Sequence, residues 1–289
     1  MTRRIAVNCE PSKLDSRAID ERGAREGLDT VGRDFLHRLP TALDARQRVE
    51  FESMGIAIDL IDLAMENLKA GAADIVATAD GSPNWSLSRR KRLEMIREAW
   101  LIVDQLYALR KLIESAGRSI DLKSSKTFLS STSAASKLRN YMDHLKDQMG
   151  NLVARSSPLA PIHGILTFAF LKPDDLAPPD IGGYTSWQVA MIMGSAMQLP
   201  LRAETLTSKY KTIVANGDHF ALQAFDVTLD LSGAAARALA FGDDLGTQVE
   251  AGFREAASKA GQSADALLTI KAEGAAWIVK VSGATATTD

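Results

Sequence analysis

Apolar residues in the first half of the chain recur at the spacing of amphipathic α-helices. Between residues 51 and 71 they follow one another in steps of four and three, and a second stripe runs between residues 92 and 117. Side chains at this spacing lie on one face of a helix, so each stripe is expected to pack against a core. The stripes consist of Met54, Ile58, Ile61, Met65 and Leu68, and of Leu93, Ile96, Trp100, Val103, Tyr107 and Ile113.

Glycine and proline predict where these helices begin and end. Gly71 and Gly117 close the two stripes, and glycine is common just past the last residue of a helix. Residues 72–88 contain Gly, Pro, Asn and Ser, which predicts a loop between the two helices. Residues 15–47 are expected to be helical too, with Pro40 marking a break.

The pattern changes after residues 154–164, where two prolines and two serines indicate a boundary. Beyond it, runs of apolar and β-branched residues predict strands, and Asn216-Gly217 predicts a hairpin turn between two of them. The expected elements are strands over 164–171, 186–197 and 219–231, a helix over 233–261 and a closing hairpin over 266–282.

These patterns together predict an α+β protein. An all-helical domain over residues 1–155, with its core at about 50–154, would be followed by a smaller antiparallel α+β module over residues 158–283. Residues 284–289 are expected to form a disordered tail.

Composition and charge narrow the function classes. The chain has 289 residues, of which 46% are hydrophobic and 24% charged, and its formal net charge is −2. From Pro158 onward there are 9 Lys and Arg against 14 Asp and Glu, a balance of −5, and the preceding part has 25 against 22, a balance of +3. An anionic polymer is therefore expected to bind the first half.

The N-terminal sequence and the hydropathy predict a cytoplasmic protein. The first residues carry charges without the apolar segment of a signal peptide, and no run of about 18 apolar residues predicts a membrane span. The single cysteine, Cys9, cannot form an internal disulfide. The four histidines are not at metal-ligand spacing and phosphate-binding glycine motifs are absent, so no metal and no cofactor are expected.

A basic cluster at the start of the second long helix is a candidate RNA-binding surface. It consists of Arg89, Arg90, Lys91 and Arg92, and Lys137 is added from a later segment. Cations at a helix N-terminus oppose the helix dipole at a small cost, which a solvated surface tolerates. The cluster therefore permits two interpretations, an ordinary solvated helix start and a patch that contacts phosphates.

The segment Lys137–Asp147 carries the remaining candidate chemistry. A third helix is expected from the Ser-rich residues 130–136 to Gly150. On such a helix Arg139 and His144 lie about 140° apart, whereas Arg139 and Asp143 are neighbours. One interpretation is a solvated helix face with an Arg139–Asp143 ion pair, and the other is a site completed by a second copy of the helix in a symmetric dimer.

Arg139, Asn140 and His144 also resemble the R-N-x-x-x-H form of the motif of HEPN domains. The segment before them resembles the preceding helix of bacterial HEPN-like proteins, and the resemblance covers roughly residues 50–154. It implies a helical bundle in a homodimer. It does not explain the β-containing remainder of the chain.

The resemblance implies two alternative functions. Active members of the HEPN family are metal-independent endoribonucleases of toxin–antitoxin, phage-defence and RNA-processing systems that leave a cyclic phosphate. Arg139 would then hold the scissile phosphate, His144 would be the acid and base, and Asn140 would orient the site. RNA and an antitoxin or other protein would be partners, without DNA or a membrane. Other members are non-catalytic and bind nucleotides or proteins, and here the C-terminal module would bind a partner.

Overall fold

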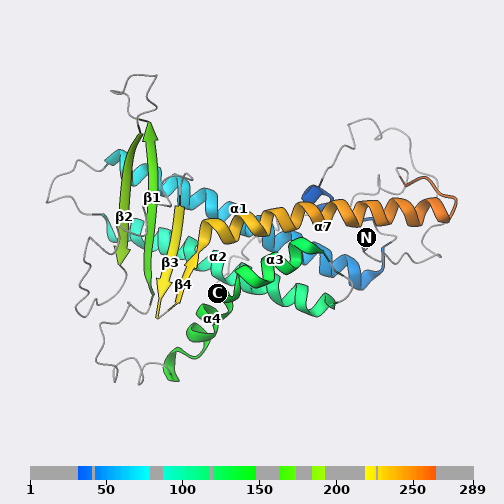
Figure 1. The fold of residues 1–289 in the computed structure, drawn as a ribbon, viewed down its shortest axis with the longest axis horizontal. Helices are drawn as coiled ribbons and strands as arrows, with labels where there is room; N and C mark the ends of the chain where they lie inside the picture. The colour runs from blue at the N-terminus through cyan, green and yellow to red at the C-terminus, as the bar shows by residue number, and fades with distance from the viewer. Residues whose placement is uncertain are drawn as a thin grey trace, which may run out of the picture.

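The computed structural model describes residues 32–40, 43–78, 87–117, 120, 122–147, 163–173, 184–192, 219–225 and 227–264. The fold is α+β, with a helical body and an antiparallel sheet at one end of it (Figure 1). Its elements in chain order are η3 (Gly32–His37), α1 (Ala45–Thr78), α2 (Arg89–Ala116), α3 (Lys123–Ser131), α4 (Ser133–Asp143), β1 (Ile165–Pro173), β2 (Tyr184–Ile192), β3 (His219–Ala224), β4 (Val227–Asp230) and α7 (Leu231–Lys259).

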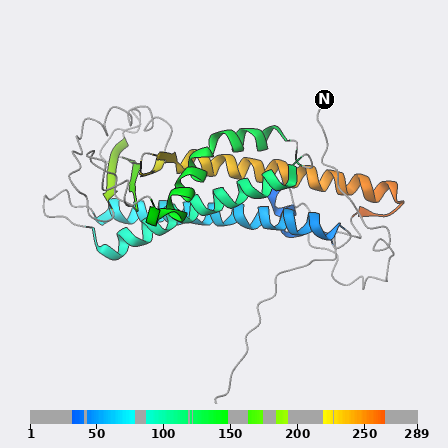
Figure 2. The same cartoon turned by 90° about the horizontal axis from the view of Figure 1, so that it is seen from below.

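The helical body is built on the antiparallel pair of α1 and α2, which Figure 2 shows side by side. The apolar stripe predicted on α1 is buried throughout, as expected. The stripe predicted on α2 is confirmed in part, since Ile96, Val103 and Ile113 are buried. The centre of the buried face is rotated from it, because Leu93 is 47% exposed while Met95 and Ala99 are buried. Steps of seven residues turn a helix side chain by only about 20°, so Leu93, Trp100 and Tyr107 stay together along the edge of the core.

One predicted helix boundary is wrong, and the third predicted helix is interrupted by a turn. Helix α1 continues through Gly71 to Thr78, because Gly71 lies inside the helix pair, where a Cβ would overlap the Met95 sulfur. The helix expected from residues 130–136 is preceded by a separate helix, α3. Helix α4 ends at Asp143, and after a turn at His144 residues 145–147 are helical again; residues 148–150 lie outside the described residues.

Thr132 separates α3 from α4. Its hydroxyl donates to the Phe128 carbonyl at 2.7 Å and accepts from Arg110 Nη1 at 3.1 Å. Arg110 also donates to the Leu129 carbonyl. An arginine on α2 whose side chain is 13% exposed thus fixes the bend between α3 and α4.

The sheet has the strand order β2-β1-β3-β4, and each neighbouring pair is antiparallel. Phe168 on β1 lies opposite Phe220 on β3, with ring centroids 5.6 Å apart. The expected single strand over 219–231 is instead a hairpin of β3 and β4. Phe225 turns the chain there with a φ of 57°, so the near-alternation on either side belongs to two strands.

One hydrophobic core runs through both expected domains. Helix α7 packs on η3, α1 and α3, and the Phe241 ring on α7 stacks on Phe128 of α3 at 6.0 Å. The Trp100 indole on α2 donates to the His163 carbonyl at 3.0 Å, just before β1. The expected boundary at 155–158 lies outside the described residues, so the division into two domains stays a prediction.

Several other predictions fall outside the described residues. They are the helix over residues 15–31, the Asn216-Gly217 turn, the hairpin over 266–282 and the tail over 284–289. Among the described residues, no helix is long and apolar enough to cross a membrane.

Candidate functional site

Arg139 on α4 is held between two carboxylates. Its Nε lies 3.3 Å from Asp104 Oδ1 on α2, and its Nη1 lies 3.0 Å from Asp143 Oδ1 one turn further along α4. The Asp143 contact is the ion pair that the helical spacing predicts. The guanidinium of this side chain, which is 37% exposed as a whole, is therefore occupied by protein carboxylates at the positions that a phosphate would take.

Of the two partners of Arg139, Asp104 is the one whose ionised form is disfavoured by burial. Burial raises the pKa of its carboxyl above the ordinary value, Arg139 acts in the opposite direction, and Asp143 adds to the rise. The ionised carboxylate is thus only partly compensated by Arg139. Replacing it with an amide would leave Arg139 with one carboxylate and make its guanidinium more available.

His144 is the turn residue that ends α4, with residues 145–147 helical after it. Its backbone N–H donates to the Asn140 carbonyl at 3.1 Å, and its φ and ψ of −104° and 25° end the helix. The imidazole is 62% exposed, and its Nδ1 lies 3.9 Å from Asp147 Oδ2. Within the described residues, the charged groups in contact with His144 and Arg139 are carboxylates.

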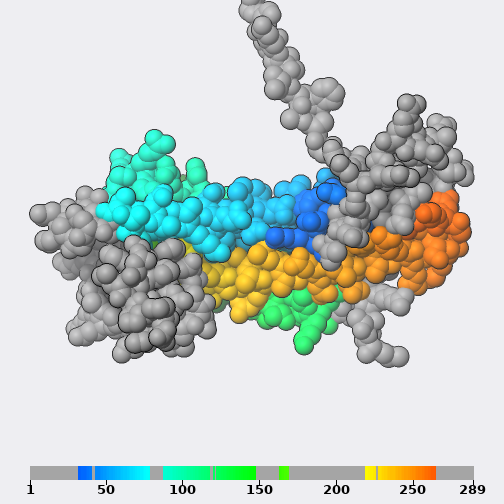
Figure 3. All heavy atoms as spheres, turned by 90° about the horizontal axis from the view of Figure 1, so that it is seen from above, coloured from blue at the N-terminus to red at the C-terminus, as the bar shows by residue number. Residues whose placement is uncertain are grey.

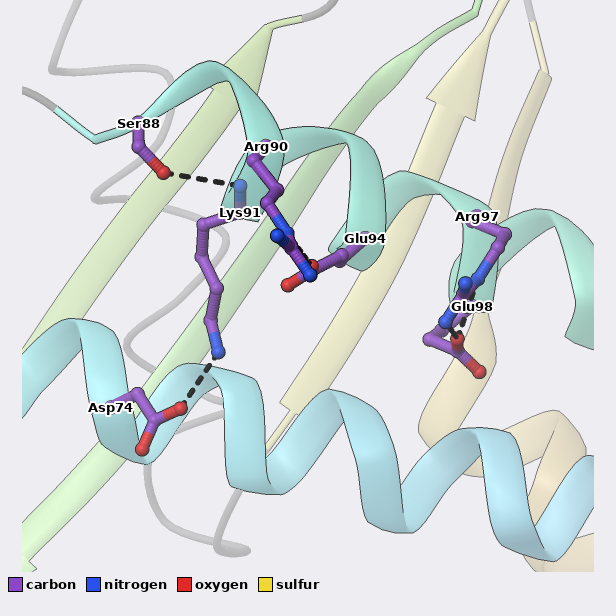
Figure 4. A network of polar contacts seen from close by, with 7 residues as sticks. All are labelled: Asp74, Ser88, Arg90, Lys91, Glu94, Arg97 and Glu98. Atoms are coloured by element: carbon purple, nitrogen blue, oxygen red, sulfur yellow. Dashed lines mark hydrogen bonds and ion pairs between the residues drawn. The ribbon is translucent and has the colours of Figure 1, made fainter.

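The predicted basic cluster lies at the start of α2, where Ser88 caps the helix by accepting from the Lys91 backbone N–H at 3.2 Å (Figure 4). Lys91 Nζ reaches Asp74 of α1 at 2.7 Å, and Arg90 Nε reaches Glu94 at 2.9 Å. The charges of Lys91 and Arg90 are therefore balanced by neighbouring carboxylates, and the Lys91–Asp74 ion pair links α2 to α1.

A further ion pair follows one turn along α2. Arg97 Nε donates to Glu98 Oε1 at 2.9 Å, and the Glu98 carboxylate, which is buried, also accepts from Asn67 Nδ2 at 3.3 Å. Since a buried carboxylate needs such partners, this contact is structural.

A surface cavity of about 480 Å³ adjoins the basic cluster. Its described lining residues all come from α2 and are Arg89, Arg90, Leu93, Glu94 and Arg97. Arg89 forms no ion pair within the described part of the chain. The cavity therefore offers one unneutralised cation beside an exposed leucine, which is less than a phosphate-binding surface of several cations.

The structure brings the candidate residues together in two groups. Arg139, Asn140, His144 and the exposed Lys137 lie on or at the end of α4, and the basic cluster lies at the start of α2. Asp104, the contact of Arg139, is 14 residues after Arg90 on α2, which corresponds to about 21 Å along the helix axis. One chain does not place the basic cluster beside the Arg139–His144 motif.

A third surface lies on α1, and the sequence interpretation missed it. Val49, Ile56 and Leu63 are 60%, 50% and 52% exposed, and their spacing of seven residues turns each from the next by only about 20° around the helix. We call them the apolar row. The spacing is visible in the sequence, but only the buried stripe on the opposite side identifies this row as outward-facing.

Helix α1 is open to solvent along much of one face of the molecule, where it lies beside α7 (Figure 3). Among the described residues, no group of three or more His, Cys, Asp or Glu side chains forms a metal-ligand cluster.

Comparisons with protein-family models, with curated proteins and with solved structures find no match for this chain. The HEPN resemblance therefore stays a prediction.

Proposed function

We propose that this protein is a non-catalytic interaction module that binds a partner protein through the exposed face of α1. The observation that carries the proposal is the apolar row of Val49, Ile56 and Leu63. Apolar residues that are exposed together on one face mark interaction sites more often than isolated ones do. These three contribute nothing to the core, which the opposite face of α1 supplies.

Covering the apolar row would make a substantial contribution to the free energy of binding. Full burial of a Val, Leu or Ile side chain contributes about 1.5–3 kcal/mol, and about half of each remains available here, so covering all three would contribute about 2–4 kcal/mol. A groove on a partner, or a helix packed along α1, would cover them together. The motif on α4, by contrast, presents an arginine that two carboxylates already occupy.

The proposal predicts position-specific crosslinking in cells that express the protein. A photo-crosslinking amino acid at Ile56 or Leu63 is expected to give a discrete adduct with another protein. The matched control is Lys69, which is exposed on the same helix but about 140° away from Ile56 around the axis, and it is expected to give none. The adduct mass distinguishes a partner from a second copy. Adducts at all three positions, or at none, would argue against this surface.

Ribonuclease activity is the second candidate function. The exposed imidazole of His144 and the surface position of Arg139 favour it, because both remain accessible to a second protomer. Exposed ion pairs contribute only about 0–1 kcal/mol, so a phosphate could displace Asp104 and Asp143 from Arg139. Such an enzyme would be a metal-independent endoribonuclease of toxin or defence type, acting as a dimer.

RNA cleavage in EDTA tests this candidate. The wild type is expected to cleave, and His144→Ala is expected to lose activity by about a hundredfold or more, as for removal of an acid–base group. Asp104→Asn is expected to cleave faster than the wild type, because it releases Arg139 from one carboxylate. No cleavage by the wild type, or equal cleavage by the wild type and His144→Ala, would exclude the ribonuclease.

A further inference from the structure

An acidic row accompanies the apolar row along α1. Glu52, Asp59 and Glu66 each follow a member of the apolar row by three residues, and residues three apart are neighbours on a helix surface. All three are exposed. Asp59 lies 2.9 Å from His37 Nε2, and neither Glu52 nor Glu66 forms an ion pair within the described part of the chain.

The other side of the apolar row carries no charge from Ser53 onward. Arg46, at the start of this side, is exposed and pairs with Glu50 at 2.9 Å. Ser53, Leu60 and Asn67 follow the same row by four residues, between it and the buried side of α1. Ser53 and Leu60 are half-buried and Asn67 is exposed. From Ser53 onward, the open face of α1 therefore has a fixed order across its width, from an uncharged edge through the apolar row to an acidic edge.

We propose that the partner presents an amphipathic helix whose apolar seam is flanked by lysine or arginine. The inference rests on the proposed function, because it assumes that the apolar row is the docking surface. Residues repeating every seven positions on two helices can pack as a coiled-coil-like pair. Basic side chains beside the seam would then meet Glu52, Asp59 and Glu66, and the carboxylates would select such a helix and reject an acidic one.

A second copy of α1 is a poor occupant for the same reason. In an antiparallel two-fold pair each edge faces its own copy, so Glu52 and Asp59 would oppose the same carboxylates. Arg48, at the start of this edge, could offset only the outermost of them, Glu66. In a parallel pair the acidic edge would face the edge of Ser53, Leu60 and Asn67, whose cation at the start, Arg46, already pairs with Glu50. Neither arrangement of two copies supplies the cations that would pair with Glu52, Asp59 and Glu66.

Two synthetic helical peptides about three heptads long test the proposal with the purified full-length chain. Both carry a leucine seam, and the flanking positions are lysine in one and glutamate in the other. From three added surface ion pairs we expect the lysine peptide to bind about tenfold more tightly in fluorescence anisotropy. High salt should reduce this preference, because exposed charges are screened.

Three variants separate the apolar contribution from the charge contribution. Ile56→Ser with Leu63→Ser is expected to abolish binding of both peptides, with an unchanged circular dichroism spectrum because both side chains are exposed. Glu52→Gln, Asp59→Asn and Glu66→Gln together should remove the preference for the lysine peptide. The matched control makes the same change of charge away from α1, with Glu94→Gln, Glu114→Gln and Asp147→Asn, and it should retain the preference.

The outcomes distinguish failure of the basic-helix proposal from failure of the docking surface itself. Equal binding of both peptides that depends on Ile56 and Leu63 would overturn the basic-helix proposal and leave the docking surface standing. Binding of neither peptide would overturn both. A dimer of the chain alone that Ile56→Ser with Leu63→Ser dissociates, detected by light scattering, would replace the basic helix with a second copy.

Discussion

A fragment that ends at residue 157 is expected not to unfold cooperatively, although it contains the whole expected helical domain. The reason is that α7, which comes from the other part of the chain, fills the centre of the core. Phe241, Leu245, Val249 and Phe253 are fully buried. Removing them leaves their partners on η3, α1 and α3 facing water.

The size of the loss supports this expectation. Burial of each large apolar side chain contributes about 1.5–3 kcal/mol, so the four together contribute about 6–12 kcal/mol. A whole domain is typically stable by only about 5–15 kcal/mol. The fragment therefore loses as much as its entire stability, before any contribution from the sheet.

Urea unfolding followed by circular dichroism measures the effect. The matched control is a chain that ends at residue 264, which retains α7 and is expected to unfold in one transition. A sigmoidal transition for the shorter fragment, near the midpoint of the control, would show instead that residues 1–157 fold as an independent domain. The expected division into two domains would then be correct.

The local elements could be predicted from the sequence because their signals are local. The buried stripe of α1 follows from steps of three and four residues, and the Arg139–Asp143 ion pair follows from their spacing on one helix. Helix α7 was expected within two residues of its observed ends. In each case the pattern that predicts the element lies within the element itself.

The tertiary features could not be predicted in this way. The partner of Arg139 on α2, Asp104, is 35 positions earlier in the sequence, and no periodicity relates the two residues. The break between α3 and α4 is held by Arg110, which lies 22 positions before Thr132 in the sequence. The outward orientation of Val49 and Ile56 is defined only once the opposite side of α1 is known to be buried. The candidate sites depend on such contacts, and for this reason the sequence suggested a motif without showing what occupies it.

At Gly246 the structure reverses the stability change that helix propensity predicts for a glycine-to-alanine substitution. Replacing a glycine inside a helix with alanine ordinarily stabilises it by about 1 kcal/mol. At Gly246 of α7 a Cβ would overlap the Gly32 carbonyl oxygen and lie 2.5 Å from its carbon and 3.0 Å from the Arg33 nitrogen. These are backbone atoms of η3, which cannot move aside by changing a rotamer.

Gly246→Ala is therefore expected to lower the free energy of unfolding by about 2 kcal/mol or more, because η3 must separate from α7. Gly71→Ala is the matched control, since Gly71 is also a buried helix glycine. Its added Cβ would overlap the Met95 sulfur, but a methionine side chain can repack, so a change within about 1 kcal/mol is expected. Urea denaturation of both variants measures the difference. If Gly246→Ala were as stable as Gly71→Ala, the close packing of η3 on α7 would be wrong, and so would the shared core that depends on it.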